Sequence, residues 1–142
     1  MKLWQKGAAA HEKVDTFTVG KDREYDLVLA QYDCEASMAH AKMLGKIGLI
    51  SDAEAEHLCT VLADLKVQAE NGSFTIEEAF EDMHSKIEHV LTEKLGDLGK
   101  KIHTARSRND QVLVALHLYL KQELGEIKTQ VIALFDLLLE LA

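Results

Sequence analysis

The sequence from Ser107 onward carries one uninterrupted apolar pattern, and this pattern constrains the fold more than any other feature. Apolar residues recur at alternating intervals of four and three, and no stop signal follows them. The members are Leu120, Leu124, Ile127, Val131, Leu134, Leu138 and Leu141. A 3.5-residue period is typical of helices that pack in bundles. At about 1.5 Å per residue, one helix from Ser107 would be roughly 50 Å long.

The last twelve residues, VIALFDLLLELA, are apolar on more than one face of such a helix. Only Asp136 and Glu140 are charged, and Ile132, Phe135 and Leu139 add a second stripe beside the first. A single partner helix cannot cover that much apolar surface. We therefore expect a large multi-helix core, whose other members come from further sequence or from other subunits.

The rest of the sequence also predicts an all-α fold. It has no proline, where ordinary usage gives about seven in this length. Helix signals appear in three further places, and a helix should begin at Ser107 with an acidic residue, Asp110, at its third position. The three are a helix over residues 22–46 ended by glycines, a helix capped by Ser51 and Glu54 and stopped at Asn71-Gly72, and a helix that starts between Thr75 and Asp82 and ends at Gly96. The composition of residues 1–21 predicts an irregular arm, and that of residues 96–104 predicts a linker.

Charge and composition exclude several functions. A net charge of −8 opposes binding to nucleic acid, whose phosphates select basic surfaces. The spacing of Cys34 and Cys59 indicates neither a disulfide framework nor a zinc site. We expect both cysteines to be buried and to pack as small apolar side chains. We find no signal-peptide pattern and no stretch of about 20 apolar residues, so we expect no membrane partner and a cytoplasmic location.

The densest polar cluster runs from His103 to Gln111, where a loop enters the long helix. A helix start presents free N–H groups and attracts anions. With Arg106, Ser107, Arg108 and Asn109 it could form a clamp for a substrate carboxylate. Alternatively, Ser107 only caps the helix and the arginines pair with nearby acids. The residues alone leave both interpretations open.

Two other polar groups are weaker candidates. Asp82 flanks Met83 and could orient the imidazole of His84, although such pairs are common on ordinary surfaces. His84 and His89 are five apart, which does not place two ligands on one helical face, so we expect no metal site. Ser37 and His40 share a helix face and could meet a ligand, but core polar contacts are the more common explanation.

The segment HTARSRNDQV, residues 103–112, resembles the HTGRSRNDQV signature of the argininosuccinate lyases and delta-crystallins. Three further matches occur in that family's order and extend the resemblance over essentially the whole chain. They are Lys2-Leu3-Trp4, Ser37-Met38-Ala39-His40-Ala41 and Glu81-Asp82-Met83-His84.

The resemblance implies a carbon–nitrogen lyase that reversibly eliminates L-arginine from argininosuccinate and leaves fumarate, the last step of arginine biosynthesis, with no cofactor. It implies homotetramers around long central helices, with active sites built from three subunits. We accordingly expect residues 1–105 to form an N-terminal helical domain and residues 106–142 to begin a central bundle domain.

Residue by residue, the resemblance assigns Ser107, Arg108 and Asn109 to binding the succinyl part of the substrate. It places Asp82 and His84 near the site, and Thr104 and Arg106 lie in the same signature. The family's proton-transfer residues belong to a Thr-His pair and a GSSxMPxKxNP loop, neither of which is present. We therefore expect an N-terminal part of a longer protein, with no catalytic residue of its own and no activity alone.

The sequence departs from the family pattern at several positions. Gly20 replaces a serine often used to bind substrate, Ala105 replaces the signature glycine, Val114-Ala115 replaces a Thr-Asp pair, and Gln5-Lys6-Gly7 replaces GGRF. We expect alanine to be tolerated at residue 105, although it costs about 1 kcal/mol or more if φ is positive there. Two other functions stay open: a non-catalytic, crystallin-like assembly module, and a lyase of the same superfamily that acts on another succinyl adduct.

Overall fold

The computed structural model describes residues 17–142, and all regular structure in that range is helical, which confirms the all-α prediction. The elements are α2 (Asp22–Lys46), α3 (Asp52–Glu70), α4 (Met83–Leu95), α5 (Asp97–Lys100), the 3-10 helix η1 (Lys101–His103) and α6 (Arg108–Leu141). Most of the predicted N-terminal arm lies outside the described residues, and within it residues 17–19 are helical.

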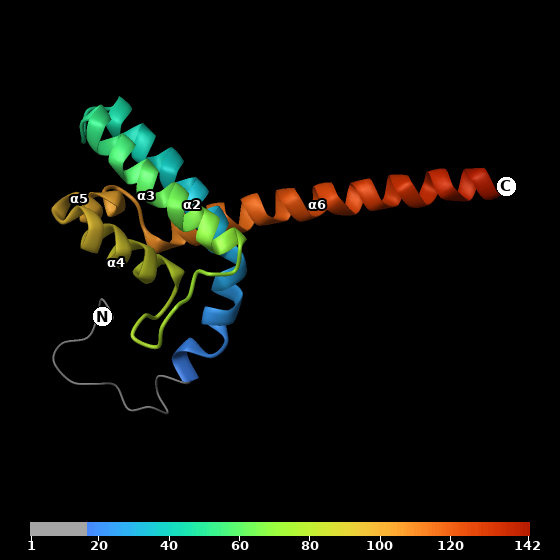
Figure 1. Cartoon of the computed structure of the whole chain (residues 1–142), viewed down its shortest axis with the longest axis horizontal. Helices are drawn as coiled ribbons and strands as arrows, with labels where there is room; N and C mark the ends of the chain where they lie inside the picture. Colours follow the sequence, from blue (N-terminus) through green and yellow to red (C-terminus); the bar gives the residue numbers. More distant parts are fainter. Residues whose placement is uncertain (1–16) are drawn as a thin grey trace.

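Helices α2 and α3 form an antiparallel hairpin that supplies most of the core (Figure 1). The predicted capping box starts α3: the Ser51 hydroxyl accepts from the Glu54 amide, and the Glu54 carboxylate accepts from the Ser51 amide. Leu44, Leu58 and Leu62 are fully buried between the helices. Burying a leucine side chain stabilises a fold by roughly 1.5–3 kcal/mol, so the contacts between α2 and α3 contribute substantially to stability.

Helix α4 begins at Met83, directly after the last residue of the range predicted for its start. Asp82 is its N-cap, and the capping pattern from Thr75 to Glu78 starts no helix. Phe80 is buried just before the cap, and Arg23 of α2 binds the carbonyl oxygen of Phe80 at 2.8 Å. A tertiary contact therefore uses a carbonyl that a helix starting at Thr75 would need for its own hydrogen bonds.

The predicted linker after Gly96 is a further correction, because it contains α5 and η1. Gly99 allows this packing: a Cβ atom there would lie 2.3 Å from the carbonyl carbon of Leu91, so only glycine lets α5 approach α4. Ile102 in η1 is buried and anchors the segment to the core. Buried apolar contacts, which local sequence does not show, explain why the linker is ordered.

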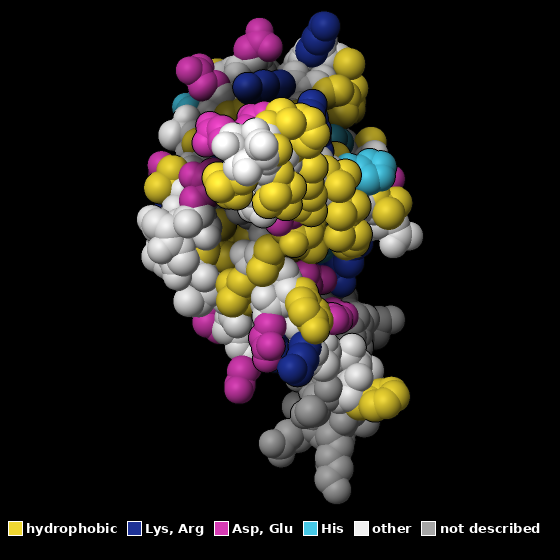
Figure 2. Space-filling model, turned by 90° about the vertical axis from the view of Figure 1, so that its right-hand side faces the viewer, with side chains coloured by type: hydrophobic (Ala, Val, Ile, Leu, Met, Phe, Trp, Pro, Cys, Tyr) yellow, Lys and Arg dark blue, Asp and Glu magenta, His cyan; other side chains and the backbone are white. Residues whose placement is uncertain are grey.

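Helix α6 has 34 residues, which corresponds to about 51 Å and agrees with the predicted length. Its first turns pack against α2: Gln111 and Ala115 are buried, and the Tyr119 ring meets Tyr32 edge-on at 5.8 Å. The helix then projects from the body, and every residue from Leu124 onward is exposed (Figure 1). Figure 2 shows apolar side chains covering this projecting end.

The cysteines agree in part with their prediction. Cys34 is fully buried, and burial raises the pKa of its thiol, whereas Cys59 is partly exposed. Both thiols are free. Within residues 17–142, no helix combines the length and apolar character needed to cross a membrane.

Candidate functional site

Ser107 is the N-cap of α6, and Asp110 completes its capping box. The Ser107 hydroxyl accepts a hydrogen bond from the Asp110 amide at 3.4 Å, and the Ser107 amide donates to the Asp110 carboxylate at 2.8 Å. The hydrogen bonds from Ser107 lower the pKa of Asp110 below its ordinary value. The capping role of Ser107 is therefore confirmed, and the Asp110 carboxylate already occupies part of the anion-attracting helix start.

Arg108 joins the start of α6 to the start of α4. Its Nη1 lies 3.0 Å from the Asp82 carboxylate and 3.7 Å from that of Glu81, and its Nη2 donates to the Ser85 hydroxyl at 2.9 Å. Asp82 also accepts from the Ser85 amide at 2.8 Å, as the N-cap of α4. The alternative in which an arginine pairs with nearby acids therefore holds for Arg108. A ligand carboxylate would have to share this guanidinium.

His84 and Asp33 form a buried pair between α4 and α2. Their side chains are 5% and 0% exposed, and His84 Nδ1 lies 3.1 Å from Asp33 Oδ2. Asp82 was predicted to orient His84, but the described residue within ion-pair distance of this ring is Asp33. Local spacing could not show a contact across the core. The available signal was that Asp33 lies on the same buried face of α2 as Ala30 and Ser37.

Arg106 contacts Ser37, which lies on the same buried face of α2 as Asp33. Its Nη1 and Nη2 atoms each donate to the Ser37 hydroxyl at 3.1 Å, and burial lowers the pKa of the guanidinium. His40 Nε2 lies 3.0 Å from the carbonyl oxygen of Thr104, so this nitrogen carries the proton. Ser37 and His40 therefore contact the chain itself and fix the loop that leads into α6.

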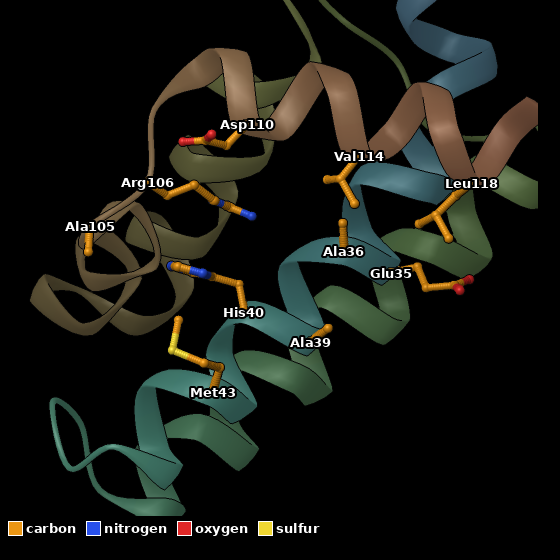
Figure 3. Close-up of a pocket in the computed structure, with 10 residues that line it drawn as sticks. All are labelled: Glu35, Ala36, Ala39, His40, Met43, Ala105, Arg106, Asp110, Val114 and Leu118. Atoms are coloured by element: carbon orange, nitrogen blue, oxygen red, sulfur yellow. The ribbon is translucent and has the colours of Figure 1, made fainter.

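The two arginines of the signature segment line different cavities. Arg106 lines a cavity of about 570 Å³ between α2 and the start of α6, whose wall is mainly apolar and includes Val114 (Figure 3). Arg108 lines a second cavity of about 360 Å³, together with Asp82 and His84. We call this second space the acidic cavity. The structure thus brings Arg108, Asp82 and His84 to one place and directs Arg106 to another.

The remaining predicted residues lie at the edge of these features. Thr104 and Asn109 are exposed, and Asn109 lies in the first turn of α6. Within residues 17–142, no three His, Cys, Asp or Glu side chains converge in a way that would hold a metal ion.

The described residues form a body of packed helices, a polar segment at residues 103–111 and a long projecting helix. The chain belongs to the lyase family, whose model matches residues 9–142. Within that family it is a homologue of argininosuccinate lyases, as the signature segment predicted.

Three relatives show the extent of the similarity. The chain is 51% identical over 138 residues to the argininosuccinate lyase of Phocaeicola vulgatus, which covers 97% of this chain and 31% of that protein. It is 48% identical to the argininosuccinate lyase of Thermotoga neapolitana, over 94% of this chain and 33% of the relative. It is 44% identical to the argininosuccinate lyase of Xylella fastidiosa, over 89% of this chain and 29% of the relative. The chain therefore spans about a third of the length of these relatives.

Proposed function

We propose that this chain supplies the N-terminal part of an argininosuccinate lyase, which eliminates L-arginine from argininosuccinate and leaves fumarate. The observation that carries the proposal is the 51% identity over 97% of the chain to a protein of that name. Because the chain spans 31% of that relative, we assign the activity to a longer polypeptide. That protein would act in the cytoplasm, in arginine biosynthesis, without a cofactor.

The elimination removes a proton from the succinyl carbon next to a carboxylate and breaks the bond from the neighbouring carbon to the guanidino nitrogen. The electron pair of the C–H bond becomes the double bond of fumarate, and the nitrogen leaves with the pair of the broken bond. Negative charge develops on the carboxylate, so fixed N–H donors near it lower the barrier. Arg108, Asn109 and the Ser107 N-cap are our candidates for binding, with Asp82 and His84 in the same cavity as Arg108. Thr104 and Arg106 are further candidates from the same segment, although Arg106 lines the other cavity.

The projecting half of α6 supports the proposal that the protein is a homo-oligomer, a tetramer in the longer form. Leu124, Ile127, Val131, Leu134 and Leu138 are each more than half exposed along one stripe. A stripe of this period fits helix-bundle packing. We infer that residues 106–142 begin the bundle domain and residues 1–105 form the N-terminal domain.

A non-catalytic assembly module is the second candidate function. Two observations favour it: Arg108 is already paired with Asp82, Glu81 and Ser85, and Gly20 stands where the family often has a substrate-binding serine. The same apolar stripe would serve such a module equally well. Measured turnover separates the two functions.

The test is fumarate release from argininosuccinate, measured side by side for this chain and for the complete reading frame that contains it. We expect turnover from the longer protein and none from the 142 residues alone. Robust turnover by this chain would overturn the assignment of proton transfer to other segments. An inactive but folded longer protein would support the assembly module.

A variant of the longer protein tests the binding residues. We expect Asn109→Ala to lower kcat/KM roughly tenfold, because one lost hydrogen bond costs about 1 kcal/mol or somewhat more. Asn71→Ala is the matched control, since Asn71 is an exposed C-cap of α3. Equal activity of the two variants would remove Asn109 from the site.

A further inference from the structure

Asp33 of α2 is a charged residue in the core. Among residues 17–142 it is the only Asp, Glu, Lys or Arg whose side chain is buried, and it is 0% exposed. Neither of its carboxylate oxygens accepts a hydrogen bond from a described residue. Taking a carboxylate out of water costs free energy that hydrogen bonds or a positive charge must offset. Because described residues supply no such hydrogen bonds, the surrounding charges decide how Asp33 is held.

Two groups that can carry positive charge face Asp33, and they come from different segments. His84 of α4 places Nδ1 3.1 Å from Asp33 Oδ2, which is an ion pair when the imidazole is protonated. Arg106 lies in the loop that enters α6. Burial lowers the pKa of its guanidinium, and attraction to Asp33 is the largest effect that opposes this. One buried carboxylate therefore attracts both the start of α4 and the loop before α6.

Ser37 adds a direct contact on the Arg106 side. It follows Asp33 by one helical turn, so both side chains lie on the same buried face of α2. The Ser37 hydroxyl accepts hydrogen bonds from both Nη atoms of Arg106, each at 3.1 Å. The Arg106 guanidinium is thereby held against the face of α2 that carries the Asp33 carboxylate.

Both partners of Asp33 are close in sequence to residues of the candidate site. His84 comes two residues after Asp82, the N-cap of α4, and Arg106 comes two residues before Arg108. Arg108 in turn contacts Asp82, with Nη1 3.0 Å from the carboxylate. The contacts form a closed ring from Asp33 through α4 to the Asp82–Arg108 pair, and back through the loop to α2. The pair opposite Asp33 in this ring therefore depends on how Asp33 holds the two segments.

We propose that Asp33 is a positioning residue, whose buried charge sets the placement of the α4 start relative to the α6 start and thereby aligns Asp82 with Arg108. Ser37 supports it on the loop side. Asp33 is 0% exposed, so it acts through these segments and touches no ligand. The positioning itself is independent of lyase activity. Only its consequence for the binding of argininosuccinate rests on the proposed function.

The experiment is amide hydrogen exchange of the 142-residue chain, measured by NMR for the wild type and for Asp33→Asn, which removes the charge and keeps the side-chain shape. Two amides report on the two helix starts. The Ser85 amide donates to Asp82 and the Ser107 amide donates to Asp110, each at 2.8 Å. We expect both amides to exchange roughly tenfold faster in the variant, relative to amides in the middle of α3, because the two starts open without unfolding of the hairpin.

Two control variants separate positioning from a general loss of stability. Cys34→Ala shortens a fully buried neighbour without removing a charge, and its effect at both helix starts should follow the exchange of α3. Asp64→Asn removes an exposed carboxylate from α3 and should alter neither helix start. Three results of Asp33→Asn would overturn the proposal: faster exchange at only one helix start, a change in proportion to α3, or a response that Cys34→Ala equals relative to α3.

If Asp33→Asn does not fold, Ser37→Ala tests the loop side of the ring. We expect the Ser107 amide to exchange roughly threefold faster in that variant, relative to α3, while the Ser85 amide is unaltered. An unaltered Ser107 amide would overturn the proposal.

Kinetics of the longer protein test the consequence for the substrate. We expect Asp33→Asn to raise KM for argininosuccinate roughly fivefold and to change kcat less than about threefold, because the groups that it aligns are binding groups. An unchanged KM would overturn that consequence. Faster exchange at both helix starts together with an inactive wild-type longer protein would retain the positioning and remove the enzyme assignment. Turnover by the longer protein together with unaltered helix starts would do the opposite.

Discussion

Ala105 holds a backbone conformation that alanine seldom adopts. Its φ is +56°, in the left-handed region, and among described residues other than glycine it is alone in having a positive φ. The turn is fixed from both sides, because His40 contacts the carbonyl oxygen of Thr104 and Arg106 donates to Ser37. The prediction that alanine is tolerated therefore has a physical cost: the loop keeps its shape at the expense of about 1 kcal/mol of backbone strain.

Replacing Ala105 by glycine should stabilise the protein. We expect the free energy of unfolding to rise by about 0.5–1 kcal/mol, since relief of the left-handed strain outweighs the extra freedom of glycine in the unfolded chain. Chemical denaturation measures the change. Ala63→Gly is the control, because Ala63 is exposed within α3 and glycine there should destabilise by up to about 1 kcal/mol. A loss of stability in the Ala105 variant would show that the turn is unstrained.

The roles of single residues were predictable where they depend on near neighbours. Ser107 as a cap follows from the spacing to Asp110, because both partners lie within one helical turn. The Asp33–His84 pair and the Arg106–Ser37 contact join residues that are far apart, and one sequence contains no direct signal of such pairs. The division of the two arginines between two cavities was unpredictable for the same reason.

Elements were predicted best where caps and apolar period agree. Helix α2 spans Asp22–Lys46 as predicted, and α3 follows its capping box to the stop at Asn71. The start of α4 was predicted only as a range and α5 was not predicted, and in both places a buried contact decides: Phe80 with Arg23 in one case and Gly99 against Leu91 in the other. Local signals set the ends of a helix only when tertiary contacts leave those ends free.

The capping box of α3 predicts a pH dependence at the element scale. The Lys101 ammonium, at 2.6 Å, and the Ser51 amide lower the pKa of Glu54 to about 2, from an ordinary value of 4.5. Because the folded-state pKa is the lower one, the stabilisation is present above about pH 4.5 and is lost as the pH falls toward 2. Carboxyl NMR titration should therefore give a midpoint near 2 for Glu54.

Two variants check that cause. Lys101→Met should move the Glu54 midpoint upward, because the ammonium is the largest contribution to the shift. Glu54→Gln should flatten the loss of thermal stability between pH 4.5 and 2, whereas Glu56→Gln, an exposed change on the same helix, should leave it unaltered. An unmoved midpoint in the Lys101 variant would contradict the ion pair.

At the scale of the whole molecule, the described residues divide into a packed helical body and an exposed end of α6. The hairpin, α4 and the first turns of α6 bury a common core, while every residue of α6 from Leu124 onward is exposed (Figure 1). The apolar period alone predicted the length of α6, and it further predicts that this helix needs partners. The acidic cavity required the assembled fold, because its walls come from three helix starts.

The exposed apolar end of α6 predicts self-association of this chain. Removing several leucines and isoleucines from water gains roughly 1.5–3 kcal/mol each, enough to offset the entropy lost on association. We expect sedimentation equilibrium to give an oligomer, and Ile127→Glu with Leu134→Glu to return it to the monomer. The control pair is Gln122→Glu with Thr129→Glu, exposed residues with the same seven-residue separation on the opposite side of α6. That pair adds the same charge and should leave the oligomer intact. Equal dissociation by both pairs would mean that net charge, rather than the apolar stripe, controls association.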